Sequence, residues 1–339
     1  WVIDDSKMVF KNLSWNPGVF KVFDEILTNA ADESQRNTTV KSIKVDVSPD
    51  QISILNDGSG IPVEIHKEHN IYVAELIFGS LLSSSNYDDT EKRTTGGTNG
   101  LGAKLTNIYS TEFIIETVCS GKKYIQVFKN NLTDISKPKI TASKGKEYTK
   151  ITFKPDFVKF GIESLDSGTL SVLQKRTYDI CAVTNKGVSV FFNGNKLTVK
   201  DFQDYISLYI GTKTESPRVY EESRRWKVGV SLGKESFQCV SFVNGISTTD
   251  GGSHVDHVIF PIIKKITEEL QAKHKNITIK PQYVKDSLFL FIDCIIENPT
   301  FSSQTKDKNT TRVTEFGSRF VPSDDFIKKI MKLGFVDSL

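Results

Sequence analysis

The chain has 339 residues, of which 25% are charged and 38% hydrophobic, and its formal net charge is +3. This balance is typical of a globular chain with a sizeable core and argues against a dedicated nucleic-acid binder, although it leaves room for local basic patches. The length favours two domains over one. No apolar run is long enough to cross a membrane and no signal peptide is visible, so we expect no membrane contact. Because the chain opens on Trp1 rather than on methionine, we expect an excised fragment.

The cysteines and histidines do not predict a metal site. The four cysteines are scattered without any Cys-x-x-Cys spacing, which is typical of buried thiols in a reducing compartment: Cys119, Cys181, Cys239 and Cys294. His254 and His257 lie about one helical turn apart, but no cysteine or acidic residue at ligand spacing completes a zinc site. We therefore expect both histidines to be ordinary helix residues.

The first predicted element is a long helix that begins at Asn16-Pro17. Asparagine is a good N-cap, and proline is tolerated at the first helical position. Apolar side chains then recur at helical spacing and predict a buried face, made of Phe20, Phe23, Leu27, Ala30 and Ala31. A second face carries Glu25, Asn29 and Asp32. The helix is therefore expected to pack through one side and to present polar groups on another.

Alternating patterns then predict strands over 43–47 and 52–54, followed by a short helix over 71–78. Residues 79–98 are polar and serine-rich, and a long loop of this kind is often a functional lid. Further strands are predicted over 112–118, 123–127 and 149–153, and a helix over 170–181. The strand over 188–192 leads into Asn193-Gly194, a strong hairpin signal.

The polar stretch 211–223 lacks an apolar pattern, so we place a domain boundary there and expect domains at 1–212 and 213–339. Beyond it, strands are predicted over 226–231 and 237–243. Gly251-Gly252-Ser253 leads into a helix over 254–270, with Ser253 as its expected cap. A strongly apolar run over 287–296 predicts a buried strand, and a last helix is predicted to begin at 326.

Two polar residues of the first helix suit phosphate chemistry. Glu25 is a candidate general base, because ATP hydrolysis needs a group that deprotonates and orients a water in line with the terminal phosphate. Asn29, one turn later, is a candidate Mg²⁺ ligand, because its amide oxygen is a hard donor. A lone Glu-x-x-x-Asn pair is more often a solvated helix face, so this pattern needs support from elsewhere in the chain.

A second motif follows the strand over 52–54 and reads Asn56-Asp57-Gly58-Ser59-Gly60. The amide oxygen of Asn56 could accept a hydrogen bond from the amino group of adenine. Gly58 and Gly60 lack a Cβ and so let the backbone approach a flat ligand closely. The alternative is a simple tight turn, which Asn-Asp-Gly also suits.

The third motif is rich in glycine and precedes a helix. Clustered backbone N–H groups at such a position bind phosphates, and the motif is neither a Walker A loop nor a Rossmann fingerprint. A flexible loop is the alternative interpretation. Its members are Gly96, Gly97, Thr98, Asn99, Gly100, Leu101, Gly102, Ala103 and Lys104. Taken together and in this order, the three motifs indicate binding and hydrolysis of ATP.

The three motifs resemble those of the ATPase family shared by gyrase-type topoisomerases, heat-shock chaperones, sensor histidine kinases and MutL-type repair proteins. Longer blocks are similar to eukaryotic-type type IIA DNA topoisomerases, at residues 23–32, 81–89, 95–105, 241–246, 251–255 and 297–306. The resemblance covers essentially the whole chain. It implies a Bergerat-type α/β fold, which is a two-layer sandwich with a mixed, largely antiparallel sheet, followed by a smaller α/β transducer domain.

The resemblance also implies roles within an ATP and Mg²⁺ site. It makes Glu25 the base, Asn29 the magnesium ligand and Asn56 the adenine contact. It places Ser84, Ser85 and Asn86 at the ribose and phosphates, and Gly97 to Lys104 around the triphosphate. Gln304-Thr305-Lys306 would come from the second domain, with Gln304 and Lys306 at the γ-phosphate, so that Lys306 couples hydrolysis to a domain rotation.

The resemblance further implies a homodimer that forms on binding ATP and traps double-stranded DNA. The residues that cut and reseal DNA would lie beyond Leu339, so we expect this chain alone to be an ATPase without DNA cleavage. A lysine cluster that touches DNA in the family is represented here only by Lys273, His274 and Lys275. The expected location is the nucleus of a cellular eukaryote, or the host cytoplasm if the source is a large DNA virus.

Three alternatives remain open at the level of sequence. One is a chaperone-like or MutL-like ATPase clamp, against which the Gln304-Thr305-Lys306 block argues. Another is a histidine kinase, which would not need Lys306 from a second domain. The last is a nucleotide-binding switch without turnover, against which Glu25 argues.

Overall fold

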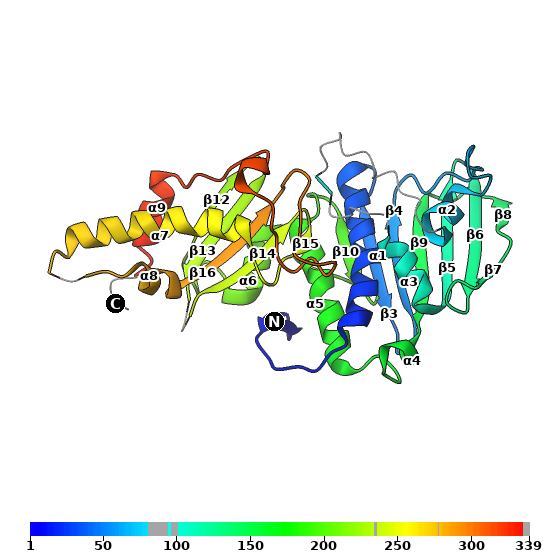
Figure 1. Cartoon of the computed structure of the whole chain (residues 1–339), viewed down its shortest axis with the longest axis horizontal. Coiled ribbons are helices and arrows are strands. Elements are labelled where there is room, and N and C mark those ends of the chain that lie inside the picture. Colours follow the sequence, from blue (N-terminus) through cyan, green and yellow to red (C-terminus); the bar gives the residue numbers. More distant parts are fainter. Residues whose placement is uncertain (81–93, 96–100, 234–235, 277, 335–339) are drawn as a thin grey trace. The chain divides into compact units, whose positions relative to one another are not determined.

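The computed structural model describes residues 1–80, 94–95, 101–233, 236–276 and 278–334, and the chain forms two compact units that divide between Asp201 and Phe202 (Figure 1). The domain boundary expected after residue 212 stays a prediction.

Part of the predicted nucleotide site lies outside the described residues, and so does most of the loop predicted over 79–98. The site residues concerned are Ser84, Ser85, Asn86, Gly96, Gly97, Thr98, Asn99 and Gly100.

The first unit is built on one mixed sheet. In the part of the chain that the structure describes, its strand order is β11-β10-β3-β4-β9-β5-β6-β7, and β8 pairs with β6. The contact of β10 with β3 is parallel, and the other pairs are antiparallel. The strands are β3 (Ser42–Val47), β4 (Ile52–Asp57), β5 (Ser110–Cys119), β6 (Lys122–Lys129), β7 (Asp134–Ile135), β8 (Lys139–Ala142), β9 (Tyr148–Pro155), β10 (Ser189–Phe192) and β11 (Asn195–Lys196).

Helices cover this sheet and complete a two-layer sandwich, as predicted (Figure 1). The long helices α1 (Pro17–Arg36) and α5 (Ser167–Val183) pack against each other, and α3 (Gly102–Ile108) packs on α1. The strands β1 (Val2–Asp4) and β2 (Lys7–Val9) pair with each other, and the helices α2 (Val73–Gly79) and α4 (Phe157–Phe160) are short.

The local signals at the ends of these elements are confirmed. The side chain of Asn16 accepts a hydrogen bond from the Val19 backbone N–H at 3.0 Å, and Pro17 opens α1. Asn193 and Gly194 have φ of 47° and 77°, the left-handed conformations that favour a tight hairpin between β10 and β11.

The second unit has a five-stranded sheet within the described residues, in the order β12-β13-β16-β14-β15, with β14 and β16 parallel. The long helix α7 (Ser253–Lys273) packs its apolar side chains into the core with those of the sheet. The strands are β12 (Arg218–Ser223), β13 (Trp226–Leu232), β14 (Gln238–Val243), β15 (Ile246–Ser247) and β16 (Leu288–Cys294). The other helices are α6 (Phe202–Ile210), α8 (Pro281–Asp286), α9 (Asp324–Met331) and the short 3₁₀ helix η1 (Val313–Glu315).

One strand of this unit lies where no element is predicted, and one expectation is wrong. β12 occupies the second half of the stretch 211–223, where pairing with β13 outweighs the polar composition. Ser253 is not the cap of α7. The cap is Gly252, and Ser253 is the first helical residue.

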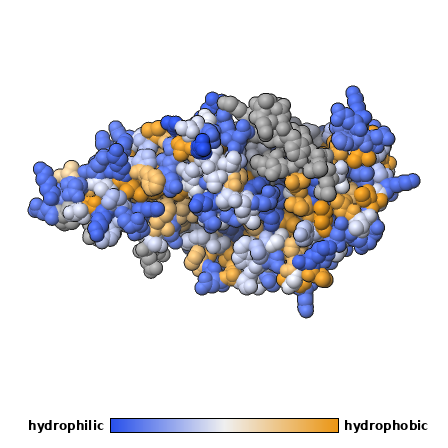
Figure 2. Space-filling view, viewed as in Figure 1, coloured by the Kyte–Doolittle hydropathy of each residue, from blue (hydrophilic) through white to orange (hydrophobic). Residues whose placement is uncertain are grey.

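The four cysteines are free thiols; Cys181 and Cys294 are buried, and Cys119 and Cys239 are partly buried. Among the described residues, no helix combines the length and apolar character that a membrane span needs. Hydrophilic side chains cover much of the face in Figure 2, with apolar patches between them.

Candidate active site

The middle of α1 carries the two residues expected to act on phosphate. The side chain of Glu25 is only 11% exposed, whereas Asn29 one turn later is exposed. Glutamate is rarely buried unless a partner or a function holds it. This placement favours a built site over the alternative of a solvated helix face.

Glu25 lies directly against the start of α3. A Cβ added to Gly102 would come within 1.8 Å of Glu25 Oε2, so a larger residue at this position would have to displace the carboxylate. The first and third sequence motifs therefore meet, through the carboxylate of one and the backbone of the other. Their spacing in the chain could not have shown this contact.

Lys21 is a further site residue that the sequence motifs did not indicate. Its Nζ forms an ion pair with Glu25 Oε1 at 2.8 Å, one turn earlier on α1. The spacing of four residues is a signal that could have found it, because such residues are neighbours on a helix surface. The ion pair restricts where the carboxylate of Glu25 can lie.

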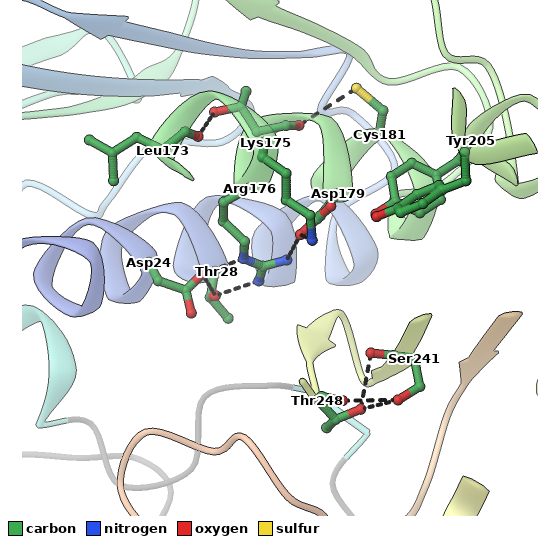
Figure 3. Close-up of polar contacts among 12 residues, drawn as sticks. Asp24, Thr28, Leu173, Lys175, Arg176, Asp179, Cys181, Tyr205, Ser241 and Thr248 are labelled. Atoms are coloured by element: carbon green, nitrogen blue, oxygen red, sulfur yellow. Dashed lines mark hydrogen bonds and ion pairs between the residues drawn. The ribbon is translucent and has the colours of Figure 1, made fainter. Parts of the chain in front are cut away.

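A buried charged network fixes α1 beside Glu25 (Figure 3). The guanidinium of Arg176, on α5, donates to Asp24 Oδ1 from Nε at 2.6 Å and to Thr28 Oγ1 from Nη2 at 3.4 Å. Asp179 lies 4.0 Å from the same guanidinium and accepts a hydrogen bond from Lys175 at 2.8 Å. Because Asp24 is the neighbour of Glu25, this network sets the position of the helix turn that carries the candidate base.

The second motif forms the end of β4 and the turn after it. Asn56 is buried, as an adenine contact would need to be. Gly60 has φ of +67°, and a Cβ there would lie 2.1 Å from the carbonyl oxygen of Val118 on β5. The next backbone N–H, of Ile61, donates to Thr117 Oγ1 at 2.8 Å. The turn is therefore held tightly against β5, and its glycine is required by the backbone.

Asp57 has a structural role in the same motif. Its Oδ1 accepts the backbone N–H groups of Lys41 and Ser42 at 2.7 and 2.6 Å. These bonds tie the end of β4 to the start of β3. Packing also favours glycine at position 58, because a Cβ there would lie 2.9 Å from a methyl group of Val40.

The described part of the third motif places a cation at the start of α3. Leu101 precedes the helix, and Gly102, Ala103 and Lys104 form its first turn. Lys104 is 1% exposed, and burial lowers the pKa of its ammonium group. A nearby phosphate would favour the charged form of such a group.

The remaining predicted residues lie in the second unit. Gln304 and Thr305 are exposed and form a turn, and Lys306 is buried. Lys306 has φ of +62°, a conformation uncommon for residues other than glycine. The loop that carries these three residues is held at its base by backbone hydrogen bonds.

The donor set fits one magnesium ion held largely by phosphate oxygens. Within the described residues there is no group of three or more His, Cys, Asp or Glu side chains that could hold a metal. Asn29 offers an exposed amide oxygen one turn after Glu25, and Mg²⁺ often takes only one or two protein ligands alongside substrate phosphates.

Two family models match the chain, one largely in each unit. The model described as histidine kinase-, DNA gyrase B- and HSP90-like ATPase matches residues 16–159, which hold the three motifs. The model described as DNA gyrase B matches residues 193–334, which hold the Gln304–Lys306 turn.

Individual proteins match over almost the whole chain. A DNA topoisomerase 2 from Candida glabrata is 47% identical over 98% of this chain and 25% of its own length. The crystal structure of the ATPase region of Saccharomyces cerevisiae topoisomerase II is 46% identical, with a TM-score of 0.93 over 99% of this chain and 90% of that one. The ATPase and transducer domains of DNA topoisomerase II from Balamuthia mandrillaris give 39% and 0.94, covering 100% and 88%. Relatives named DNA topoisomerase 2 also include one from Acanthamoeba polyphaga mimivirus, and the chain spans about a quarter of the length of such relatives.

Proposed function

Because this chain belongs to the family of topoisomerase II ATPase and transducer regions, we propose that it binds and hydrolyses ATP as the clamp of a type IIA DNA topoisomerase. The observation that carries the proposal is the contact of Glu25 with Gly102, because it joins a carboxylate on α1 to the start of the phosphate motif. These relatives also favour a topoisomerase over a chaperone-like or MutL-like clamp.

ATP is bound by groups from several elements in this proposal. Asn56, near the end of β4, accepts a hydrogen bond from the amino group of adenine, beside the turn held against β5 by Gly60 and Ile61. Lys104, with Gly97 to Ala103, surrounds the triphosphate. The other contacts are Ser84, Ser85 and Asn86 at the ribose and phosphates, and Gln304, Thr305 and Lys306 from the second unit.

Glu25 is the general base in this proposal. It takes a proton from the water that attacks the γ-phosphate, and ADP and inorganic phosphate are the products. Asn29 holds Mg²⁺, which neutralises charge on the phosphates when it is bound. Lys21 keeps the carboxylate of Glu25 in place before the nucleotide arrives.

Dimerisation and DNA capture complete the proposed function. The segment before α1 exposes large apolar side chains, with Phe10 at 70%, Trp15 at 40% and Leu13 at 38%, which suits a surface covered by a second copy of the chain. Lys273 and Lys275 are exposed at and just after the end of α7, as phosphate contacts to double-stranded DNA would need. In this proposal the clamp works in the nucleus, or in the host cytoplasm of a large DNA virus, and DNA cleavage and resealing are assigned to no residue of this chain.

The test is steady-state ATP turnover measured against protein concentration, for the unchanged chain and for Glu25→Gln. We expect turnover per chain to rise with concentration, because two chains must meet. Glu25→Gln should lower turnover by roughly 10²–10⁴-fold, which is the usual contribution of a general base, while nucleotide binding is retained.

Glu33→Gln is the matched control, because it makes the same change two turns later on α1, where Glu33 is half-buried and accepts a hydrogen bond from Asn37. It should leave turnover unchanged. Retained turnover in Glu25→Gln would remove Glu25 from the role of base, and turnover independent of concentration would contradict the nucleotide-gated dimer.

A further inference from the structure

The loop that carries Gln304, Thr305 and Lys306 is closed by hydrogen bonds at its base. The N–H of Thr310 donates to the carbonyl of Thr300 at 2.9 Å, and that of Ser302 donates to the carbonyl of Lys308 at 3.0 Å. At the tip, the N–H of Lys306 donates to the carbonyl of Ser303 at 3.1 Å. The loop is therefore closed by backbone hydrogen bonds at its base and at its tip. The position of its base determines the position of Lys306.

The base of the loop is joined to the start of α7 through Asn309. The N–H of Asn309 donates to the carbonyl of Gly251 at 3.0 Å, and the N–H of Ser253 donates to the carbonyl of Asn309 at 3.1 Å. Gly252, between them, has φ of +128°, and a Cβ there would lie 2.1 Å from the carbonyl oxygen of Asn309. Gly252 is thus needed for the close approach of two backbones.

The side chain of Asn309 faces His254 in a defined orientation. Its Oδ1 accepts the backbone N–H of Thr311 at 3.2 Å and the hydroxyl of Thr311 at 2.7 Å. An N–H can only donate, so the amide oxygen must point to Thr311 and the amide nitrogen must point away from it. That nitrogen lies 3.4 Å from His254 Nδ1 and 3.2 Å from Ser253 Oγ.

This orientation fixes the state of His254. Nδ1 must accept from the Asn309 amide, so the proton of the neutral ring lies on Nε2, which donates to Thr248 Oγ1 at 3.1 Å. Thr248 in turn bonds Ser241 on β14, with the two hydroxyl oxygens 2.6 Å apart (Figure 3). Burial lowers the pKa of His254 to about 3, so the ring keeps its acceptor nitrogen at neutral pH.

We propose that His254 and Asn309 are positioning residues for Lys306: together with Gly252 they fix the base of the 300–311 loop to α7 and the β14 sheet. This inference rests on the proposed role of Lys306 at the γ-phosphate. It gives a function to Gly251-Gly252-Ser253-His254, which the sequence alone marks only as the start of a helix. It also connects α7 to the loop, so that a movement of this helix displaces Lys306.

The experiment measures kcat and KM for ATP in four proteins. These are the unchanged chain, Asn309→Ala, Lys306→Ala and the double variant. Displacement of a catalytic group by about 1 Å can cost about a hundredfold in rate. We expect Asn309→Ala to lower kcat by roughly ten- to a hundredfold with KM within about twofold. The double variant should equal Lys306→Ala, because a positioning residue has no effect once the group that it positions is gone.

Thr311→Val is the second variant, and it keeps the test valid if Asn309→Ala does not fold. It removes the hydroxyl that donates to Asn309 Oδ1 and accepts the Thr300 N–H at 2.8 Å, both at the base of the loop, and should lower kcat in the same direction. Asn276→Ala, at an exposed asparagine beyond α7, is the matched control and should be unchanged.

The outcomes separate the inference from the proposed function. An unchanged kcat in Lys306→Ala would overturn the role of Lys306 and, with it, the inference. A low kcat in Lys306→Ala with an unchanged kcat in Asn309→Ala would overturn the inference alone. Losses that multiply in the double variant would also overturn it, since they would show that Asn309 acts independently of Lys306.

Discussion

Each unit contains a buried polar network, and the two differ in charge (Figure 3). The network of the first unit joins Asp24, Arg176 and Asp179 and holds α1 to α5. The network of the second unit joins Ser241, Thr248, His254 and Asn309 and holds a loop to α7, with no charged group among these members. Both lie next to a residue that the proposed chemistry needs.

The difference shows two ways of fixing a functional group from behind. In the charged network, one guanidinium is shared by two carboxylates, so losing one partner leaves a buried charge. In the neutral network, donors and acceptors match along a chain, so losing one partner leaves an unsatisfied hydrogen-bonding group. The first network should therefore be the more sensitive to mutation. The second should be the more sensitive to pH, because it contains His254, whose pKa is lowered by burial.

The largest effect is expected from Arg176→Met, which removes the guanidinium and keeps most of the length of the side chain. It leaves the carboxylate of Asp24 buried without its cation, and breaking a buried pair in this way costs about 3–5 kcal/mol. The free energy of unfolding, measured by urea denaturation, should fall by this amount.

Arg176→Lys is the control for charge, because it keeps a cation but loses the geometry of the guanidinium. It should recover part of the loss. A loss below about 1 kcal/mol in Arg176→Met would show that the network behaves like an exposed ion pair, and the contrast between the two units would fail.

A smaller effect is expected from acid acting on His254. In the unfolded chain the imidazole takes up a proton below pH 6.5, whereas the folded chain resists protonation down to about pH 3. The unfolded state therefore binds more protons in this window, and stability falls as pH falls, by about 1.4 kcal/mol per pH unit. Between about pH 6 and pH 4 the loss due to His254 should be about 2–3 kcal/mol.

The measurement is the difference in unfolding free energy between the unchanged chain and His254→Gln at each pH. Other groups titrate in both proteins and cancel, including His257, whose pKa is also lowered, first by burial and then by Arg319. A difference that stays constant across this acidic range would mean that His254 is protonated equally in both states, contrary to its place in the neutral network.

The smallest effect is expected from Thr248→Val. The isosteric change leaves His254 Nε2–H without its acceptor, at a cost of about 1–2 kcal/mol in unfolding free energy. Thr249→Val alters the exposed neighbour and should change little. Equal effects of the two variants would indicate that the buried network contributes no more than a surface hydroxyl.

The sequence predicts the fold best where the signal is local. Asn16-Pro17 determines the start of α1, and Asn193-Gly194 determines the β10–β11 hairpin, because these residues act through their own backbone conformations. Helix α6 lies outside the predicted elements, and the polar composition of β12 favours an irregular segment, since both elements depend on tertiary packing or strand pairing more than on periodicity.

The site is predicted less completely than the fold. Residue types indicate Glu25, Asn29 and Asn56, but the burial of Glu25 against Gly102 depends on a contact between distant segments. The sequence indicates His254 only as an ordinary helix residue, because its partner Asn309 follows 55 residues later and neither residue has a distinctive neighbour pattern. Contacts of this kind become visible only in three dimensions.

The thiols of the chain have a practical consequence for labelling. Burial raises the pKa of Cys181 and Cys239 to about 12 and that of Cys294 well above its usual range, so these three form few reactive thiolates at neutral pH. Cys119 is partly exposed at the end of β5, next to Val118, whose carbonyl oxygen closes on Gly60. A thiol-specific fluorophore on the unmodified chain would therefore attach mainly at Cys119, beside the turn that follows Asn56, and would report optically on changes at that turn.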